Sequence, residues 1–254
     1  MLGPPGNGLN GRVLEGIGKW SVAYVVWAPS PMKPSPKPLQ ITVYQDVLCS
    51  WCYLADLRLE TLKHEFGDII RWRVRPYPLR VQDKRPTPKE LKGLSAEVER
   101  ARLEPEPTAG LLSTELWRGG DAPRSSIPAL VALEAARLQS PTARTQLARG
   151  MQRAALEQGI NVTRTDVIFE LASRVGLDMG PFSVAYHSDD TRQLILDEHE
   201  LASSRGVRGV PTLVIASRWM VCGLREVSEY RDLILSCLGK KFAPRAGDSE
   251  RVVH

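Results

Sequence analysis

Asp46-Val-Leu-Cys49-Ser-Trp-Cys52-Tyr53 is the stretch that decides the fold, because it places two residues between two thiols. The segment before it, 39–44, is short, apolar and rich in β-branched residues, which is typical of a strand. Apolar residues recur after it at helical spacing, at Cys52, Ala55, Leu59, Leu62 and Phe66. The pair therefore lies at a strand-to-helix junction, where a disulfide can form and break reversibly.

The two thiols differ in their expected environment. Cys49 faces the unpaired N–H groups and the positive dipole end of the helix, and both favour a thiolate. Cys52 lies one turn inside the helix, on its apolar face, so we expect it to be more buried and protonated. The sequence thus predicts Cys49 as the nucleophile and Cys52 as the resolving thiol.

Taken alone, the pair is also compatible with half of a zinc site, a structural disulfide, or chance. Zinc needs four ligands, and the remaining cysteines, Cys222 and Cys237, do not supply a second close pair. The four histidines follow no metal-binding spacing. We therefore expect no metal, and we expect Cys222 and Cys237 to be small buried apolar residues.

A second informative stretch lies far along the chain, at Gly206-Val-Arg-Gly-Val210-Pro211-Thr212-Leu-Val-Ile215. It has the pattern of a loop that enters an apolar strand directly after a proline. Proline cannot donate to a strand ladder, so it must stand at the strand's start. An X-Pro bond at such a tight entry is also where cis isomers occur.

A CxxC pair that opens a helix, followed by a distant Gly-Val-x-Gly-Val-Pro-Thr, resembles the DsbA/FrnE-like family of thioredoxin-fold oxidoreductases. The resemblance runs from about Leu39 to Leu238. Residues 69–77 look like the family's second strand, and residues 151–176 resemble its inserted helices. In that family the proline is cis and lies against the cysteine pair.

The resemblance implies an α/β protein with a thioredoxin fold and a large all-helical insertion between the second strand and the cis-Pro strand. Residues 39–82 and 206–239 then form the thioredoxin-like domain, and residues 83–205 the helical insertion. We expect residues 1–38, rich in Gly and Pro, to be a disordered extension and residues 240–254 to be a loose tail.

Local signals predict the helices of the insertion. We expect a loop over 83–120 that contains a short helix near 90–102. Ser125 or Ser126, before Pro128, predicts the cap of the next helix. Thr163 and Asp166 resemble a capping box, and Ser188 or Asp189 can cap the last inserted helix.

The composition excludes several classes of protein. The 254 residues are 43% hydrophobic and 25% charged, as in ordinary globular chains. The net charge of +5 is spread over dispersed Arg and Lys without a nucleic-acid-binding motif, so we expect no nucleic-acid partner. The longest apolar run, 22–28, is too short to cross a bilayer.

The expected cellular location depends on how the N-terminal residues are interpreted. We favour a cytoplasmic protein; the alternative is export, with residues 1–30 acting as a signal peptide. Met32 is a further candidate for the true start, because the folded pattern begins directly after it.

The resemblance also implies roles near the cysteines. Val210 offers backbone hydrogen bonds to an extended substrate, and Pro211 shapes the groove and keeps metals from the thiols. Trp51 carries no titratable charge, so we expect a potential between about −270 and −120 mV, toward the reducing side. Trp51 is equally a candidate apolar platform for substrate. Asp46 is a candidate proton relay for Cys52, although satisfying turn N–H groups is the commoner role.

The predicted function is thiol-disulfide exchange with protein or low-molecular-weight thiols and disulfides, by a monomer or homodimer. No cofactor is required, and glutathione is a candidate co-substrate with contacts at Val210, Thr212 and the pair Asp189-Asp190. One alternative is a glutathione-dependent isomerase or kappa-class transferase of the same fold, although these typically have serine where Cys49 stands. The other is a chaperone-like binding protein without catalytic activity.

Overall fold

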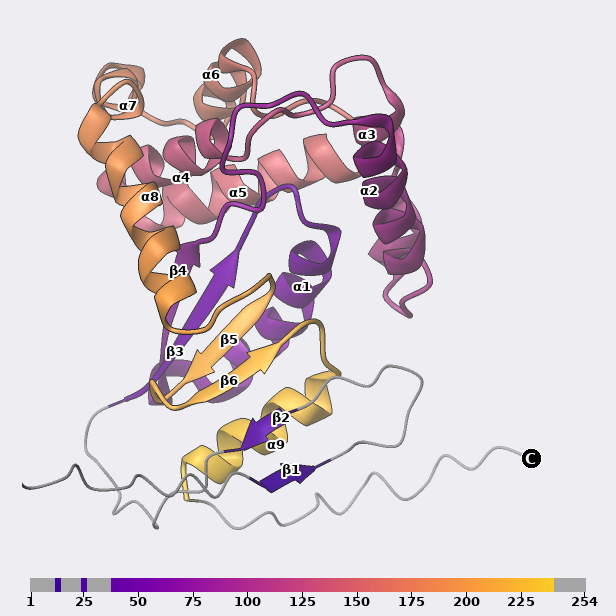
Figure 1. Ribbon diagram of the computed structural model, residues 1–254. Helices are drawn as coiled ribbons and strands as arrows, with labels where there is room; N and C mark the ends of the chain where they lie inside the picture. Colours follow the sequence, from indigo (N-terminus) through magenta and orange to yellow (C-terminus); the bar gives the residue numbers. More distant parts are fainter. Residues whose placement is uncertain (1–11, 15–23, 27–37, 240–254) are drawn as a thin grey trace, which may run out of the picture.

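In the computed structural model of the protein (Figure 1), the described residues are 12–14, 24–26 and 38–239. The strands are β1 (Arg12–Leu14), β2 (Tyr24–Val26), β3 (Leu39–Gln45), β4 (Ile70–Pro76), β5 (Thr212–Ile215) and β6 (Trp219–Cys222). The α-helices are α1 (Ser50–Phe66), α2 (Pro88–Ala101), α3 (Glu115–Arg118), α4 (Ile127–Gln139), α5 (Pro141–Leu156), α6 (Thr165–Arg174), α7 (Met179–Tyr186), α8 (Asp189–Ser204) and α9 (Val227–Cys237). Short 3₁₀ helices span Gly67–Ile69 and Pro107–Leu111.

The main sheet has four strands in the order β4-β3-β5-β6. β3 and β4 are parallel and are joined through α1, as a parallel pair requires a crossover connection. β5 pairs antiparallel with β3, and β6 pairs antiparallel with β5. Helices α2 to α8 all fall between β4 and β5, where the sequence predicts the helical insertion.

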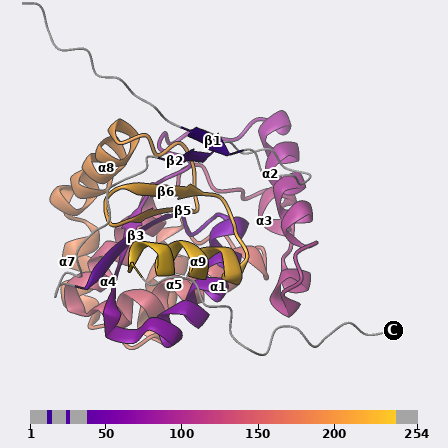
Figure 2. The ribbon, with the colours of Figure 1, turned by 90° about the horizontal axis from the view of Figure 1, so that it is seen from below.

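Helices cover both faces of this sheet (Figure 2). Leu59 and Leu62 of α1 and Tyr230 of α9 pack with Ile41 and Ile215 on one face, all fully buried. On the other face, a smaller cluster joins the sheet to α8 and the loop that follows it, through Tyr44, Tyr77, Ala202 and Val207. The sheet is therefore the middle layer of three.

The insertion has its own core, centred on α4. Residues 129–136 of this helix are all buried, as expected for a helix that is surrounded by other elements. The neighbouring helices α5 to α8 contribute fully buried side chains to the same cluster: Leu147, Met151, Ile168, Phe182 and Ile195. Leu54 of α1 belongs to this cluster as well, so α1 packs on both cores.

Arg58 of α1 joins the insertion to the sheet domain. Its side chain is 3% exposed and contacts Glu104 at 2.6 Å and Glu106 at 2.5 Å, both in the segment after α2. It also donates to the carbonyl of Arg225 at 2.9 Å, just before α9. One buried guanidinium thus bridges three segments, a contact that the sequence pattern does not reveal.

The 83–120 segment contains the expected helix at nearly the expected place, and it is more helical than expected. α2 begins at Pro88, where Thr87 and Glu90 form a reciprocal capping box. The same segment also contains α3 and a 3₁₀ helix, so it is mostly helical. At α4 the N-cap residue is Ser126, without a side-chain cap bond, and the hydroxyl of Ser125 accepts from the N–H of Ile127 at 3.2 Å.

The predicted cap of α6 is wrong, whereas Ser188 is the N-cap residue of α8 as one of the two predicted candidates. The residue before α6 is Arg164, and Thr163 instead donates its hydroxyl to Asn161 at 2.6 Å, within the preceding turn. Asp166 pairs with Arg164 at 2.6 Å and does not act in a capping box. Ser188 precedes α8 without a side-chain cap bond. In the first case, the competing local hydrogen bond to Asn161 takes the hydroxyl away from the helix.

Of residues 1–38, the described parts are chiefly two three-residue strands, β1 and β2, which pair antiparallel. The expectations for a signal peptide, for Met32 as the start and for the 240–254 tail fall on residues that lie largely or wholly outside the described ranges. Within those ranges, no helix has the length and apolarity needed to cross a membrane.

Candidate functional site

Cys49 is the residue that caps α1. Its backbone is extended, with φ −93° and ψ 114°, and its Sγ accepts from the N–H of Cys52 at 3.4 Å. A turn positions it, since its N–H donates to the carbonyl of Asp46 at 3.2 Å. Cys49 is 6% exposed and Cys52 is fully buried, and both are free thiols. The cysteines therefore open the helix, as the sequence predicts.

The environment of Cys52 favours its protonated form. Burial raises the pKa of the Cys52 thiol well above its usual value, and the neighbouring Cys49 raises it further. The charge of Asp56, one turn further along α1, acts in the same direction.

The loop before β5 lies against Cys49. The Val210–Pro211 peptide bond is cis, and the Sγ of Cys49 lies 3.7 Å from the carbonyl oxygen of Val210. Thr212 is buried, and its hydroxyl donates to the carbonyl of Gly209 at 2.7 Å. The fold thus brings together Cys49 and Val210, which are 161 positions apart in the sequence.

Asp46 holds the turn between β3 and α1. Its two carboxylate oxygens accept from the N–H groups of Leu48 at 3.0 Å and Leu79 at 2.7 Å. Asp46 is fully buried, and burial raises the pKa of its carboxyl group although these hydrogen bonds oppose the shift. The geometry is that of a residue which satisfies turn N–H groups.

Trp51, between the two cysteines, is held by the insertion. It is half-buried, and its indole N–H donates to the Glu97 carboxylate of α2 at 3.0 Å. Burial alone would raise the pKa of Glu97, but hydrogen bonds from Arg100 and Trp51 lower it. Glu97 was missed in the sequence because no local pattern links an acidic residue of one helix to an indole 46 positions earlier.

Tyr53 links α1 to the end of α5. Its hydroxyl donates to Glu157, and burial together with Glu157 raises the pKa of Tyr53 to about 12. A phenol that stays protonated at neutral pH is a hydrogen-bond donor here. Its hydrogen bond joins α1 to the residue that follows α5.

Other predicted residues lie apart from this cluster. Asp189 and Asp190 begin α8 and are both exposed. Cys222 ends β6 and is exposed, contrary to the expectation of a buried residue, because β6 is the edge strand of the sheet. Cys237 ends α9 and is half-buried. Among the described residues, no group of three or more His, Cys, Asp or Glu side chains could hold a metal ion.

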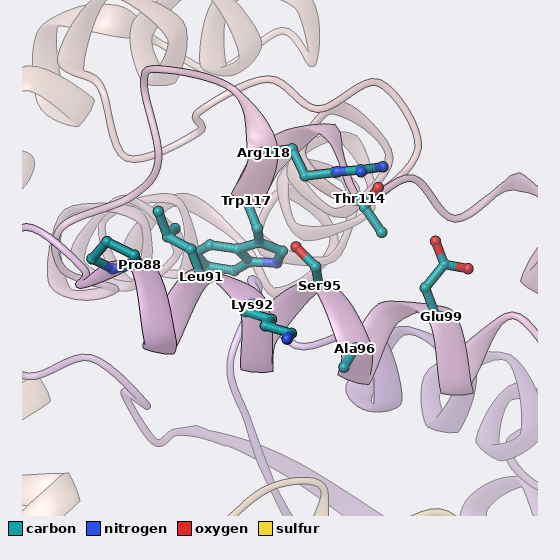
Figure 3. A pocket seen from close by; sticks show the side chains of 9 residues that line it. All are labelled: Pro88, Leu91, Lys92, Ser95, Ala96, Glu99, Thr114, Trp117 and Arg118. Atoms are coloured by element: carbon teal, nitrogen blue, oxygen red, sulfur yellow. The ribbon is translucent and has the colours of Figure 1, made fainter.

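A cavity of about 540 Å³ lies between α2 and α3 and includes neither cysteine. Figure 3 shows the indole of Trp117 beside Leu91, with Arg118 and Thr114 on the opposite side of the hollow from Lys92. The Cys49 sulfur lies instead beside the carbonyl of Val210.

Comparison with known proteins assigns the chain to a family. The family model described as a DSBA-like thioredoxin domain matches residues 40–234. The ClpXP adapter protein SpxH of Bacillus subtilis (strain 168) is 27% identical over 218 residues, which cover 82% of this chain and 70% of that protein. SpxH of Shouchella clausii (strain KSM-K16) is 28% identical over 187 residues, or 71% of this chain. That match spans only 59% of the Shouchella protein's length.

Solved structures show the same fold. A "putative protein disulfide isomerase" from Nitrosomonas europaea superposes with a TM-score of 0.71 at 19% identity, covering 79% of this chain and 98% of that one. The cytosolic disulfide reductase DsbM from Pseudomonas aeruginosa, with GSH, has a TM-score of 0.60 at 21% identity, covering 79% and 99%. The expected thioredoxin fold with a helical insertion is confirmed, and the chain belongs to the DSBA-like thioredoxin domain family.

Proposed function

We propose that this chain is a thiol-disulfide oxidoreductase whose redox-active pair is Cys49 and Cys52. The observation that carries the proposal is the position of Cys49 at the N-terminus of α1, with its Sγ 3.7 Å from the Val210 carbonyl and the buried Cys52 one turn away. Family membership supports the reaction class.

The proposed reaction has two exchange steps. The Cys49 thiolate attacks one sulfur of a substrate disulfide, forming a mixed disulfide and releasing the other sulfur as a thiolate. Cys52 then loses its proton and attacks the Cys49 sulfur, which releases the second substrate thiolate. Two electrons pass to the substrate, and the Cys49–Cys52 disulfide remains. The reverse sequence oxidises a dithiol.

The second step needs a proton acceptor, because the raised pKa of Cys52 keeps that thiol protonated. We retain Asp46 as the proposed relay, since burial raises its pKa and makes it a better base than an ordinary carboxylate. Its two backbone hydrogen bonds give it a structural role at the same time.

Substrate is proposed to bind along the Val210 backbone, next to the thiol. Pro211 shapes this edge. In the proposal, the hydrogen bond from Thr212 to Gly209 fixes the loop before β5. Trp51 forms the opposite border of the substrate site, and Glu97 orients its ring. We also propose glutathione as a co-substrate and the cytoplasm as the location of the protein. The proposed reaction is compatible with either a monomer or a homodimer.

Catalysed reduction of insulin by dithiothreitol tests the activity. The wild-type chain should accelerate insulin precipitation, and Cys49→Ser should abolish the acceleration. Cys222→Ser is the matched control, because Cys222 is an exposed thiol at the end of β6. Equal activity of wild type and Cys49→Ser would refute the proposal.

A second candidate is an adapter that delivers proteins to a protease. It is favoured by the match to the ClpXP adapter protein SpxH of Bacillus subtilis, which covers 82% of this chain. An adapter should bind ClpXP whether or not its thiols are intact. Binding of the purified chain to Bacillus subtilis ClpXP, unchanged in Cys49→Ser, would support this candidate; absence of binding would exclude it for that protease.

A further inference from the structure

A cavity of about 210 Å³ lies between α1 and α5, away from the two cysteines. Gln45 of β3 and Val74 of β4 line it from the sheet, and the rest of its lining comes from the two helices. Neither cysteine takes part in it. The volume corresponds to about seven water molecules at about 30 Å³ each, which is room for a compact ligand.

The lining of this cavity is strongly cationic. It contains four positively charged side chains and two carboxylates, so it carries an excess of two positive charges. The cations are Lys63, Arg144, Arg149 and Arg153, and the carboxylates are Asp56 and Glu60. In a partly enclosed space, charges of one sign are screened less than on an open surface and attract a counter-ion.

The two carboxylates already have partners. Asp56 accepts from the side-chain amides of Gln45 and Gln152, the latter at 3.1 Å. Glu60 pairs with Arg149 at 3.1 Å and with Lys63 at 3.4 Å. Because neutral amides occupy Asp56, its charge is not used in a direct ion pair.

Arg144 is the group that this arrangement leaves without a direct counter-ion. Its guanidinium makes neither an ion pair nor a hydrogen bond within the described ranges, and Asp56 and Glu134 act on it only as nearby charges. Burial lowers the pKa of Arg144, yet a guanidinium remains protonated in proteins. The Arg144 side chain is half-buried and lines the cavity, so a cation without a direct partner is available there to a bound anion.

We propose that this cavity binds a compact oxyanion, a phosphate or carboxylate group, at Arg144. Arginine suits such a ligand, because its planar fork of donors matches two oxygens of one group. Residues of both α1 and α5 line the cavity, so a bound anion would link α5 to the helix that carries the cysteines. The site is independent of the proposed thiol chemistry.

Thermal unfolding with added anions tests the proposal. Inorganic phosphate and succinate are titrated separately at constant ionic strength, with chloride as the balancing salt. We expect a saturable rise in the Tm with at least one of them, and the better anion identifies the group. Arg144→Gln should weaken the apparent affinity at least tenfold, and Arg144→Lys should recover part of it. Arg174→Gln is the control, since Arg174 is an exposed, ion-paired residue of α6.

Absence of a rise beyond that in chloride, or equal losses in Arg144→Gln and Arg174→Gln, would overturn the proposal. If Arg144→Gln does not fold, the proposal is tested by hydrogen–deuterium exchange of the wild type with and without the anion. Added protection within α1 and α5 is the expected result, and protection confined to other elements, or none, contradicts it.

Discussion

The indole N–H of Trp51 donates to Glu97 at 3.0 Å, so a residue inside the cysteine pair is fixed by the helical insertion. Glu97 lies on α2, and Trp51 lies in the first turn of α1. The insertion therefore holds in place a side chain that stands between the two cysteines in the sequence.

Glu97→Ala should release the Trp51 ring. A hydrogen bond to a charged acceptor contributes more than a neutral one, but Glu97 is 46% exposed, so we expect a loss of about 1 kcal/mol in the free energy of unfolding in urea. Glu99→Ala, on the same helix and similarly exposed, should cost less than half as much. In a Trp51→Phe background, Glu97→Ala should have little further effect, and an undiminished effect there would show that the hydrogen bond is not its source.

Arg58→Met should be the most destabilising of the substitutions considered. The side chain is 3% exposed and contacts two carboxylates at 2.5–2.6 Å, so its removal leaves these charges facing each other. We expect a loss of about 3 kcal/mol, measured by urea unfolding, because breaking a buried pair leaves uncompensated charge. Lys63→Met, on the same helix but 30% exposed, is the control. A similar loss for both would contradict the bridging role.

The stability of the reduced protein should depend on pH through Cys52. Its pKa is raised in the folded state, so the unfolded chain loses this proton first as the pH rises above about 8.5. The free energy of unfolding should then fall with rising pH, by at most about 1.4 kcal/mol per pH unit for one proton. Between pH 7.5 and 9.5, the free energy of unfolding should fall more steeply with pH in the wild type than in Cys52→Ala. Parallel curves would count against a protonated Cys52.

Asp46→Asn separates the structural role of this residue from a proton relay. One side-chain carbonyl cannot replace both carboxylate oxygens, so the N–H of Leu48 or of Leu79 loses its partner. We expect a loss of about 1–2 kcal/mol in stability. If Asp46 is a proton relay, Asp46→Asn should also lower the rate of insulin reduction and shift the pH profile of that rate. Unchanged kinetics would leave Asp46 with its role in the turn alone.

Local patterns predicted the framework of the fold and the place of the pair. The apolar run before Cys49, the helical spacing after Cys52 and the proline at Pro211 are signals that neighbouring residues carry, so strand, helix and loop follow from them. Local periodicity likewise predicted the helices of the insertion between β4 and β5.

Contacts between distant segments were not predictable in this way. Arg58 with Glu104 and Glu106, and Trp51 with Glu97, depend on how helices pack, which periodicity does not specify. The cap expected at Thr163 failed because Asn161 competes for its hydroxyl. The exposure of Cys222 follows from the edge position of β6, which is a property of the whole sheet.

Redox titration in glutathione buffers, with thiol trapping and mass spectrometry, tests the central claim most directly. We predict one two-electron transition between about −270 and −120 mV, confined to a disulfide between Cys49 and Cys52. Cys222 and Cys237 should remain trapped as thiols through that transition. The absence of a Cys49–Cys52 disulfide over the accessible range of potentials would contradict the account.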